Sequence, residues 1–497
     1  MLEAFVQGFF NVFHPMAFLL VIVGMFIGLF VGVVPAIGGV SGTALVLPFI
    51  YGMDPFLALP FLLSLGGVSV IGGSITSILL NIPGDTPNAA TCLDGYPMTR
   101  KGEAGRAIGA ALTAAGAGGL MGVFLSILTI PLIVPMVLGL HMAEMFFVAL
   151  IGISFLAVLS KGGQVRGMIS GGLGLLLSFV GFQATTGTAR YTFDSAFLFD
   201  GIGVIPVVMG LFAGSEIIEL AVTGEVIAKF KVAATPWRQM LQGAGDVFRH
   251  KWLWFRCVII GYIVGIIPGI GSVGAMFVAY GHAKQTSKNS DQFGTGCVEG
   301  VLAPESSNNA CHGGDLLTTI AFGIPGSTRM AVLMSAYLLV GIKPGPGLLI
   351  DNTALAFTML WTIAISSVLA AAFCFVMAPY LIRVTTVQPH HLFATIAPLI
   401  FVSVFAASTT VLNVVAVVVF SGLGVLMSRL GYSRAAFVLG FVMGEMIEDY
   451  LWLAIKLQGP LFFLRPLCLV LIAVNLAVLC YGPIKSVFGR LYKRTGA

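Results

Sequence analysis

Charged residues are scarce in this sequence. Asp, Glu, Lys and Arg make up 9% of its 497 residues, whereas hydrophobic residues make up 58%. Soluble domains contain about 25% charged residues, so the composition excludes an ordinary water-soluble fold. A helix needs about 20 apolar residues to cross the hydrocarbon core, and the apolar length of this chain allows roughly 10–14 crossings. The apolar runs are continuous rather than alternating, which predicts helices and not barrel strands.

Several chemical signatures are also missing. The seven cysteines are scattered and form no C-x-x-C pair, and the histidines show no metal-ligand spacing. We therefore expect neither a disulfide framework nor a structural metal site. The sequence contains no G-x-x-x-x-G-K-[ST] motif, which argues against ATP use by this chain. We expect no cofactor and, with a net charge of only +5, no nucleic-acid partner.

Glycine and proline are abundant, and one segment rich in them occurs twice. The segment Gly72–Ala90 reads GGSITSILLNIPGDTPNAA, and its counterpart lies within Val298–Gly347. Both are apolar enough for membrane depth, and both carry hydroxyl, amide and carboxylate side chains beside a Pro-Gly break. The alignment matches Pro83 with Pro325, Ile82 with Ile324, Gly84 with Gly326, Thr76 with Thr318, and Ser77 with Thr319.

A second matched pair precedes the first. Gly32–Val40 reads GVVPAIGGV, and Gly265–Val273 reads GIIPGIGSV. Two matched pairs in the same order indicate an internal duplication. We therefore predict an all-α, polytopic integral membrane protein with two repeats that contain broken helices or re-entrant hairpins. The first repeat is 1–220 with breaks at 35–42 and 83–87. A basic linker follows at 221–256, and the second repeat is 257–497 with breaks at 268–271 and 325–326.

Basic residues gather at two places and predict the orientation. Those of the linker are Lys229, Lys231, Arg238, Arg249, Lys251 and Arg256, and those of the C-terminus are Lys485, Arg490, Lys493 and Arg494. By the positive-inside rule both clusters face the cytoplasm. The sequence before the first apolar run has no Lys or Arg and is predicted to lie outside. The two repeats then start from opposite sides of the membrane, which predicts inverted topology.

The breaks themselves indicate a solute site. A backbone break in hydrocarbon leaves N–H and C=O groups without partners, at a cost of several kcal/mol each, unless it lines a cavity or meets a solute. A half-helix that begins there presents N–H groups to an anion, and one that ends there presents carbonyls to a cation. The alternative is that Pro-Gly only kinks packed helices. Four breaks in two matched pairs, with polar residues beside them, favour the site.

Glu305, Asn308 and Asn309 form the sharpest polar cluster, and a carboxylate at membrane depth is a functional hypothesis by default. Alternatively, Pro304 and Glu305 begin a helix at the membrane interface. Arg329 either holds a substrate carboxylate or forms a structural ion pair with Asp315 or Glu305.

Five local expectations follow from turn and capping signals. Asp54 is a predicted helix N-cap, and the sequence at 91–106 is a predicted polar hinge. The run 108–140 forms either a hairpin or one span broken at Pro131 and Pro135. Residues 185–194 form a polar loop, and 197–220 is one apolar segment.

Several of these stretches resemble one known family. PGDTPNAATCLDGYPMTRKGEAGRA, APESSNNACHGGDLLTTIAFGIPGSTRMA and GIKPGPGLL, with both Gly-rich turns and GEMIEDYL at 444–451, are similar to signature segments of the TctA family. This family comprises the large membrane subunits of tripartite tricarboxylate transporters. The chain departs from the family pattern at Asp85, His312, Trp452 and Leu453, which bears on the substrate rather than on the family.

The resemblance implies a multi-pass protein of the bacterial inner membrane that is no enzyme. It also implies a small membrane subunit and a periplasmic solute-binding protein as partners, and uptake of a citrate-like di- or tricarboxylate driven by an ion gradient. We predict Na⁺ as the coupling ion and elevator-type alternating access. The predicted substrate-binding residues are Gly38, Gly39, Ser77, Asn81, Pro83, Gly84, Asp85, Thr86, Glu305, Asn308, Asn309, Thr319, Pro325, Gly326 and Ser327. The predicted ion-binding residues are Gly271, Ser272, Asn309 and Thr318.

Ion coupling also follows from energetics. Moving one charge across 100 mV is worth about 2.3 kcal/mol, so importing a dianion costs roughly twice that, which cotransported cations must offset. Two other classes of function stay open at this point. A membrane enzyme acting on a lipid-linked substrate would need a convergent acid, base or metal set, and a passive anion channel would need an open polar path.

Overall fold

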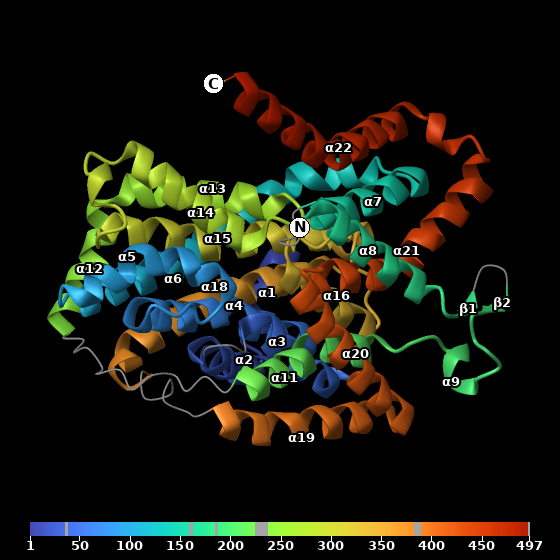
Figure 1. Cartoon of the computed structure of the whole chain (residues 1–497), viewed down its shortest axis with the longest axis horizontal. Coiled ribbons are helices and arrows are strands. Elements are labelled where there is room, and N and C mark those ends of the chain that lie inside the picture. Colours follow the sequence, from blue (N-terminus) through green and yellow to red (C-terminus); the bar gives the residue numbers. More distant parts are fainter. Residues whose placement is uncertain (35–37, 159–162, 184–186, 224–236, 382–388, 496–497) are drawn as a thin grey trace.

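The computed structural model describes all residues except 35–37, 159–162, 184–186, 224–236, 382–388 and 496–497. The part of the break 35–42 that precedes Gly38, and the linker residues Lys229 and Lys231, lie outside the described residues. The described chain is almost entirely helical (Figure 1), as the sequence predicts.

The elements of the first part of the chain are α1 (Leu2–Val12), α2 (Pro15–Val33), α3 (Gly38–Val46), the 3₁₀ turn η1 (Leu47–Ile50), α4 (Pro55–Leu80), η2 (Thr86–Asn88), α5 (Ala89–Arg100), α6 (Ala104–Leu138), α7 (Met142–Val158), α8 (Gln164–Ser178), the strands β1 (Gly181–Gln183) and β2 (Thr188–Arg190), α9 (Ala196–Phe199), α10 (Val204–Met209), the π-helical turn η3 (Gly210–Gly214) and α11 (Ser215–Thr223).

The remaining elements are α12 (Trp237–Arg249), α13 (Lys251–Ile266), α14 (Gly271–Thr286), η4 (Ser290–Gln292), α15 (Val298–Phe322), α16 (Thr328–Leu339), α17 (Pro346–Ile350), α18 (Thr353–Leu381), α19 (Pro389–Ser408), α20 (Val411–Leu430), α21 (Arg434–Gln458), η6 (Phe462–Leu464) and α22 (Pro466–Thr495).

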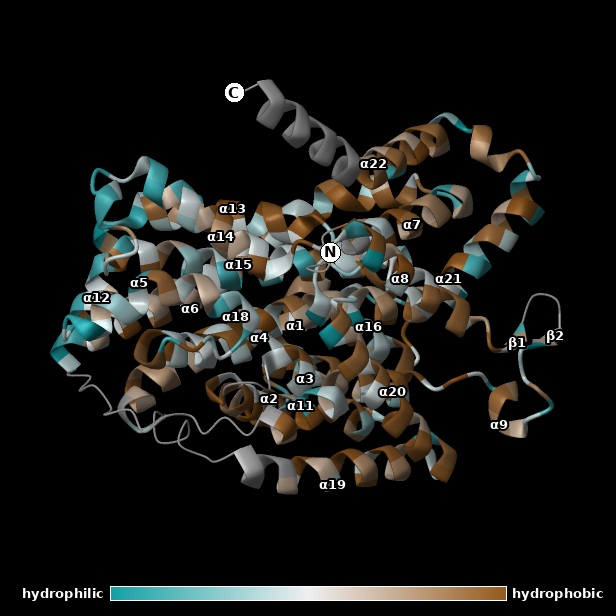
Figure 2. Ribbon diagram, viewed as in Figure 1, coloured by the Kyte–Doolittle hydropathy of each residue, from teal (hydrophilic) through white to brown (hydrophobic). Residues whose placement is uncertain are grey.

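Five helices among the described residues are long and apolar enough to cross a membrane, namely α2, α4, α6, α18 and α20. Figure 2 shows their apolar residues, and it shows hydrophilic residues gathered around α12 and the connection after α14. The strands β1 and β2 lie at the opposite end of the molecule (Figure 1). This distribution is that of a membrane protein with polar ends.

Glycines allow the helices of the first half to pack closely. Gly24, Gly28 and Gly32 recur every fourth residue on α2, the spacing that lets two membrane helices approach each other. A Cβ on Gly28 would lie 2.2 Å from the carbonyl oxygen of Leu65, and one on Gly32 would lie 1.8 Å from that of Ser69. Any side chain at these positions would therefore force α2 away from α4.

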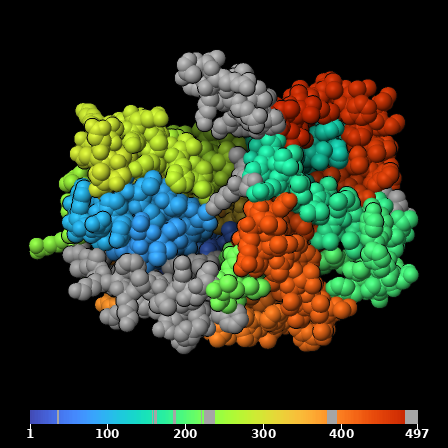
Figure 3. Space-filling model, in the orientation of Figure 1, coloured from blue at the N-terminus to red at the C-terminus, as the bar shows by residue number. Residues whose placement is uncertain are grey.

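The two halves of the sequence interlock. Helix α6 of the first half contacts α13, α15 and α18 of the second half as well as α12 of the linker, and α4 contacts α18. In the space-filling view the first-half residues shown in blue adjoin the second-half residues shown in yellow-green (Figure 3). Helix α15 is surrounded by α5, α6, α13 and α14, so its polar residues are buried in protein.

Of the local expectations, the N-cap at Asp54 is confirmed and the hinge at 91–106 is not. Asp54 is an N-cap as predicted, because its Oδ1 accepts a hydrogen bond from the Phe56 N–H at 2.8 Å. The segment 91–106 is not a hinge, since most of it forms α5 and the start of α6. Helix α6 is one continuous helix of 35 residues, and both Pro131 and Pro135 lie inside it.

The structure adds detail to three further expected segments. The loop predicted at 185–194 contains β2, which pairs antiparallel with β1. The apolar segment 197–220 is divided into α9, α10, η3 and α11. Part of the predicted linker is helical, because it contains α12 and the first turns of α13.

Candidate functional site

The first-half break follows α4. This helix ends at Asn81, whose φ of 58° and ψ of 27° place it in the left-handed region. The chain then turns through Pro83 and Gly84, and Asp85 caps the next turn, its Oδ1 accepting a hydrogen bond from the Thr86 N–H at 2.8 Å. A left-handed C-terminal residue followed by Pro is a common way to end a helix.

The second-half break has the same construction. Helix α15 ends at Gly323, with φ of 68° and ψ of 22°. After Pro325 and Gly326, the hydroxyl of Ser327 caps α16 by accepting a hydrogen bond from the Met330 N–H at 3.3 Å. Asp85 and Ser327 therefore occupy corresponding positions in the two halves.

The glycines of the two breaks pack in corresponding ways. A Cβ on Gly84 would lie 2.6 Å from the Cα of Gly73 and 2.1 Å from the carbonyl oxygen of Gly32. A Cβ on Gly326 would lie 2.6 Å from the Cα of Asp315 and 2.9 Å from the carbonyl oxygen of Gly265. The sequence alignments of the two halves pair Gly73 with Asp315 and Gly32 with Gly265. The glycines of the two breaks therefore pack against equivalent residues in their own halves.

The Gly-rich turns meet the Pro-Gly breaks. Gly38 and Gly271 both have positive φ, 65° and 61°, and they begin α3 and α14. The Gly39 N–H donates to Asp85 Oδ2 at 3.1 Å. A Cβ on Gly271 would lie 3.0 Å from the Cβ of Ser327. In the first half the N-terminus of α3 thus contacts Asp85, and in the second half the N-terminus of α14 contacts Ser327.

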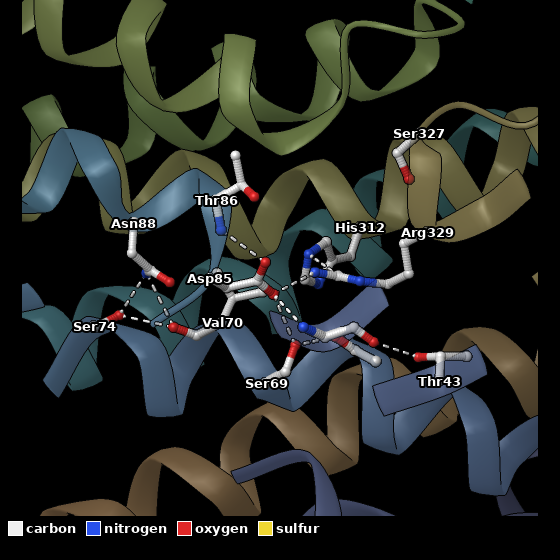
Figure 4. Close-up of polar contacts among 12 residues, drawn as sticks. Thr43, Ser69, Val70, Ser74, Asp85, Thr86, Asn88, His312, Ser327 and Arg329 are labelled. Atoms are coloured by element: carbon white, nitrogen blue, oxygen red, sulfur yellow. Dashed lines mark hydrogen bonds and ion pairs between the residues drawn. The ribbon is translucent and has the colours of Figure 1, made fainter. Parts of the chain in front are cut away.

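Asp85 is the centre of a buried polar cluster (Figure 4). Its Oδ2 also accepts a hydrogen bond from the Ser69 hydroxyl at 3.1 Å, and it lies 3.7 Å from Arg329 Nη2. Arg329 Nη1 lies 2.6 Å from His312 Nε2. An arginine N–H can only donate, so His312 accepts at Nε2 and carries its proton at Nδ1. Of the two alternatives for Arg329, a structural ion pair is present, but its partner is Asp85 and neither Asp315 nor Glu305.

A second cluster surrounds Glu305, which is fully buried in the middle of α15. This position excludes a role for Pro304 and Glu305 in starting a helix. The Thr91 hydroxyl donates to Glu305 Oε1, and Asn88 Nδ2 lies 3.5 Å from the same oxygen. Asn88 Nδ2 also lies 3.2 Å from the hydroxyl oxygen of Ser74. Residues just after the first break thus reach the polar face of α15.

The polar face of α15 carries buried atoms without a hydrogen-bond partner among the described residues. They include both side-chain polar atoms of Asn308, Asn309 and Asp315, one oxygen of Glu305, and Nδ1 of His312. Because such atoms cost about 1–3 kcal/mol each, their concentration along one helix makes this face of α15 a candidate site for a polar ligand.

The structure divides the predicted substrate-binding residues into two groups. Most are buried near the breaks or on α15, namely Gly39, Ser77, Gly84, Asp85, Glu305, Asn308, Asn309, Thr319, Pro325, Gly326 and Ser327. Asn81, Pro83 and Thr86 have exposed side chains, and Gly38 is half-buried. Ser77 donates to the carbonyl of Gly73, and Thr319 donates to that of Asp315, both within their own helices.

The predicted ion-binding residues lie on two helices that contact each other, α14 and α15. Gly271 and Ser272 begin α14, and Thr318 donates to the carbonyl oxygen of Ile266 at 3.0 Å. Asn309 lies on the side of α15 that faces α6, where a Cβ on Gly119 would be 3.5 Å from the Cβ of Asn309.

Sequence reasoning did not select Ser69, Asn88 or Thr91, which all contact a buried carboxylate. The three-residue spacing of Asn88 and Thr91 after a break was a usable signal, because it puts both on one face of the following helix.

The site is closed in this conformation. A cavity of about 10 Å³, enough for one water molecule, is lined by Thr43, Gly67, His312 and Arg329 together with apolar side chains. A larger cleft of about 350 Å³ lies between β1, α8 and α21 and is lined by Glu445, Glu448 and Arg190 among others. Arg190 and Glu448 are joined by two contacts of 2.8 Å, and this pairing raises the pKa of Arg190.

Comparison with known proteins gives one family. A model described as "Tripartite tricarboxylate transporter TctA family" matches residues 18–439. The chain is 30% identical over 484 residues to "Uncharacterized 52.8 kDa protein in TAR-I ttuC' 3'region" of Agrobacterium vitis, covering 97% of this chain and 96% of that protein. It is 29% identical over 230 residues to "Uncharacterized protein in TAR-II ttuC' 3'region" of the same organism, covering 46% of this chain and 95% of that protein. No solved structure matches the chain.

Proposed function

The chain belongs to the tripartite tricarboxylate transporter TctA family, and from that premise we propose that it imports a citrate-like di- or tricarboxylate together with cations. The observation that carries the proposal is Arg329. It is 9% exposed and, apart from histidine, it is the one buried basic residue among the described residues. A buried guanidinium at paired helix breaks suits a carboxylate, because it offers several N–H donors in a planar fork.

Arg329 has donors to spare. Its Nε has no partner among the described residues, and its contact with Asp85 is long, at 3.7 Å. In the proposed mechanism a substrate carboxylate takes the place of Asp85 on the guanidinium. The N–H groups at Gly39 and Gly271 and the hydroxyl of Ser327 complete the anion site, which lies between the two halves.

Alternating access follows from how the break segments pack. Helix α14 contacts η2 and α5, and α16 contacts α3 and α4, so elements after each break pack onto the other half. Together these segments can move as one body and carry the bound substrate across the membrane, which is elevator-type transport. An ion gradient drives the cycle, with Na⁺ as the proposed coupling ion.

We place the protein in the bacterial inner membrane as a multi-pass subunit. The positive-inside rule assigns the α12 end to the cytoplasm. The end with β1 and β2 then faces the periplasm, where a solute-binding protein delivers the carboxylate, and a small membrane subunit completes the transporter. The basic residues of α12 and the opposite position of the strands support this orientation (Figure 1).

The test is uptake of labelled citrate into vesicles that contain this chain with its small subunit and binding protein, with and without an inward Na⁺ gradient. Arg329→Lys keeps the charge but loses the planar fork, and Arg256→Lys, at an exposed position of α13, is the matched control. We expect gradient-dependent uptake that is abolished in Arg329→Lys and retained in the control. Uptake that is indifferent to both the gradient and Arg329→Lys would refute the proposal.

A further inference from the structure

Glu305 is a carboxylate without a cation. It is 0% exposed in the centre of a helix that is itself enclosed by protein. One of its oxygens receives the contacts from Thr91 and Asn88, and the other has no hydrogen-bond partner among the described residues. No ion pair joins it to a described basic residue. Leaving a buried charge uncompensated costs several kcal/mol, so this group needs a positive ion beside it when ionised.

The side chains around Glu305 supply further oxygens. Asn308 Oδ1, one helical turn after Glu305, is buried and has no hydrogen-bond partner among the described residues. The hydroxyls of Ser74 and Thr91 complete the set. Carboxylate, amide carbonyl and hydroxyl oxygens suit a hard cation rather than a soft metal.

The position of these residues links a cation to the substrate. Asn88 follows Asp85 by three residues, and both abut one point of α4. A Cβ on Gly73 would lie 2.3 Å from Asn88 Oδ1 and 2.9 Å from the backbone nitrogen of Asp85. Because Asn88 Nδ2 also lies 3.5 Å from Glu305 Oε1, an ion bound at Glu305 would fix the segment that carries Asp85 against α15. By linkage, an ion that stabilises this arrangement changes the affinity for any ligand that depends on it.

We propose that Glu305 and Asn308, with the hydroxyls of Ser74 and Thr91, bind one Na⁺ ion, and that Asn88 holds Glu305 in place by donating to its Oε1. This assigns Glu305 and Asn308 to the cation rather than to the substrate, since a carboxylate would repel an anionic substrate. It also moves the ion away from Gly271, Ser272 and Thr318. The role of this ion as the coupling ion rests on the proposed transport function, whereas its binding does not.

The test measures binding without transport. The purified full chain in detergent is heated in NaCl or in choline chloride of equal ionic strength, without substrate. A ligand that binds only the folded protein raises the unfolding midpoint, so we expect Na⁺ to raise the midpoint of the wild type in a saturable way. Glu305→Gln should lose this shift. Glu305→Asp should raise the half-saturating Na⁺ concentration at least about tenfold, a loss of about 1.4 kcal/mol.

Glu299→Gln is the matched control, because Glu299 lies on the same helix and pairs with His250 at 3.2 Å. It should keep the Na⁺-dependent shift. A shift that persists in both Glu305 variants would overturn the proposal. A wild-type midpoint that responds to pH but not to Na⁺ would also overturn it, because Glu305 would then be neutralised by a proton.

The two proposals can fail separately. If the Na⁺ shift depends on Glu305 while Arg329→Lys transports citrate normally, the substrate site is wrong and the cation site stands. If uptake needs Arg329 and a Na⁺ gradient while Glu305→Gln keeps the midpoint shift, the cation binds elsewhere and the transport function stands.

Discussion

Replacing Asp94 by Asn should destabilise the fold although it changes one atom of the side chain. Asp94 lies in α5 and is 0% exposed. Its Oδ1 accepts hydrogen bonds from the N–H groups of Gly294, Gly296 and Cys297 at 2.9, 2.8 and 2.9 Å, and its Oδ2 accepts one from the Tyr280 hydroxyl at 2.9 Å. Cys297 is the N-cap of α15, so Asp94 caps that helix from a distant part of the chain.

The expected cost can be worked from these four bonds. A hydrogen bond to a charged group contributes about 1.5–3 kcal/mol, and one between neutral groups about 0.5–1.5 kcal/mol. Asn keeps one acceptor oxygen but loses the charge, and its NH₂ group faces a donor where an oxygen accepted before. We therefore expect Asp94→Asn to lower the free energy of unfolding by roughly 2–4 kcal/mol.

The assay is the thermal unfolding midpoint of the purified protein in detergent, compared with Asp291→Asn. Asp291 is an exposed carboxylate in η4, close in sequence to the residues that Asp94 contacts. The midpoint should fall by several degrees for Asp94→Asn and stay unchanged for Asp291→Asn. Equal midpoints for the two variants would show that the capping argument is wrong.

Three further predictions concern stability. Gly326→Ala places a Cβ 2.4 Å from that of Asp315 and should cost about 1–3 kcal/mol by overpacking, whereas Gly422→Ala, with no atom within 4 Å, should leave the unfolding midpoint unchanged or raise it. Glu448→Gln removes the charge opposite Arg190, so protease cleavage within 187–195 should become faster than in the wild type. Asp54→Ala removes the cap of α4 and should lower the unfolding free energy by about 1 kcal/mol, measured by denaturant titration in detergent.

The helix breaks were predictable because proline and glycine act locally. Asn81 before Pro83 and Gly323 before Pro325 are each two residues from a Pro, and the structure ends α4 and α15 at these two positions. The polar face of α15 could also be predicted from the sequence, since the i, i+3, i+4 spacing of Glu305, Asn308 and Asn309 puts them on one side of a helix.

Other features depend on contacts that leave no local signal. The segment around Asp94 is polar and contains Pro97, so its pattern did not indicate a helix, yet α5 is held between α4, α6 and α15. The partners of Asp94 lie 186 or more residues away in the sequence. The strands β1 and β2 are three residues each, too short for the alternation of a strand to be recognised.

The interlocking of the two halves determines when the protein can complete its fold during synthesis. Gly118 and Gly122 of α6 pack on α15, where a Cβ would lie 2.6 Å from the carbonyl oxygen of Ser306 and 2.5 Å from that of Ala310. The ribosome must add residues 139–322 after α6 before α15 is complete. At about 5–20 residues per second this takes roughly 10–40 seconds.

During that interval the glycine face of α6 has neither its helix partner nor a side chain of its own to cover the backbone. The buried amide of Asn88 and the buried carboxylate of Asp85 likewise lack their second-half partners, Glu305 and Arg329, until α15 and α16 have been made. The first half is therefore an assembly intermediate that must be protected in the membrane, and a chain truncated before α15 would expose a groove to which other membrane helices could bind.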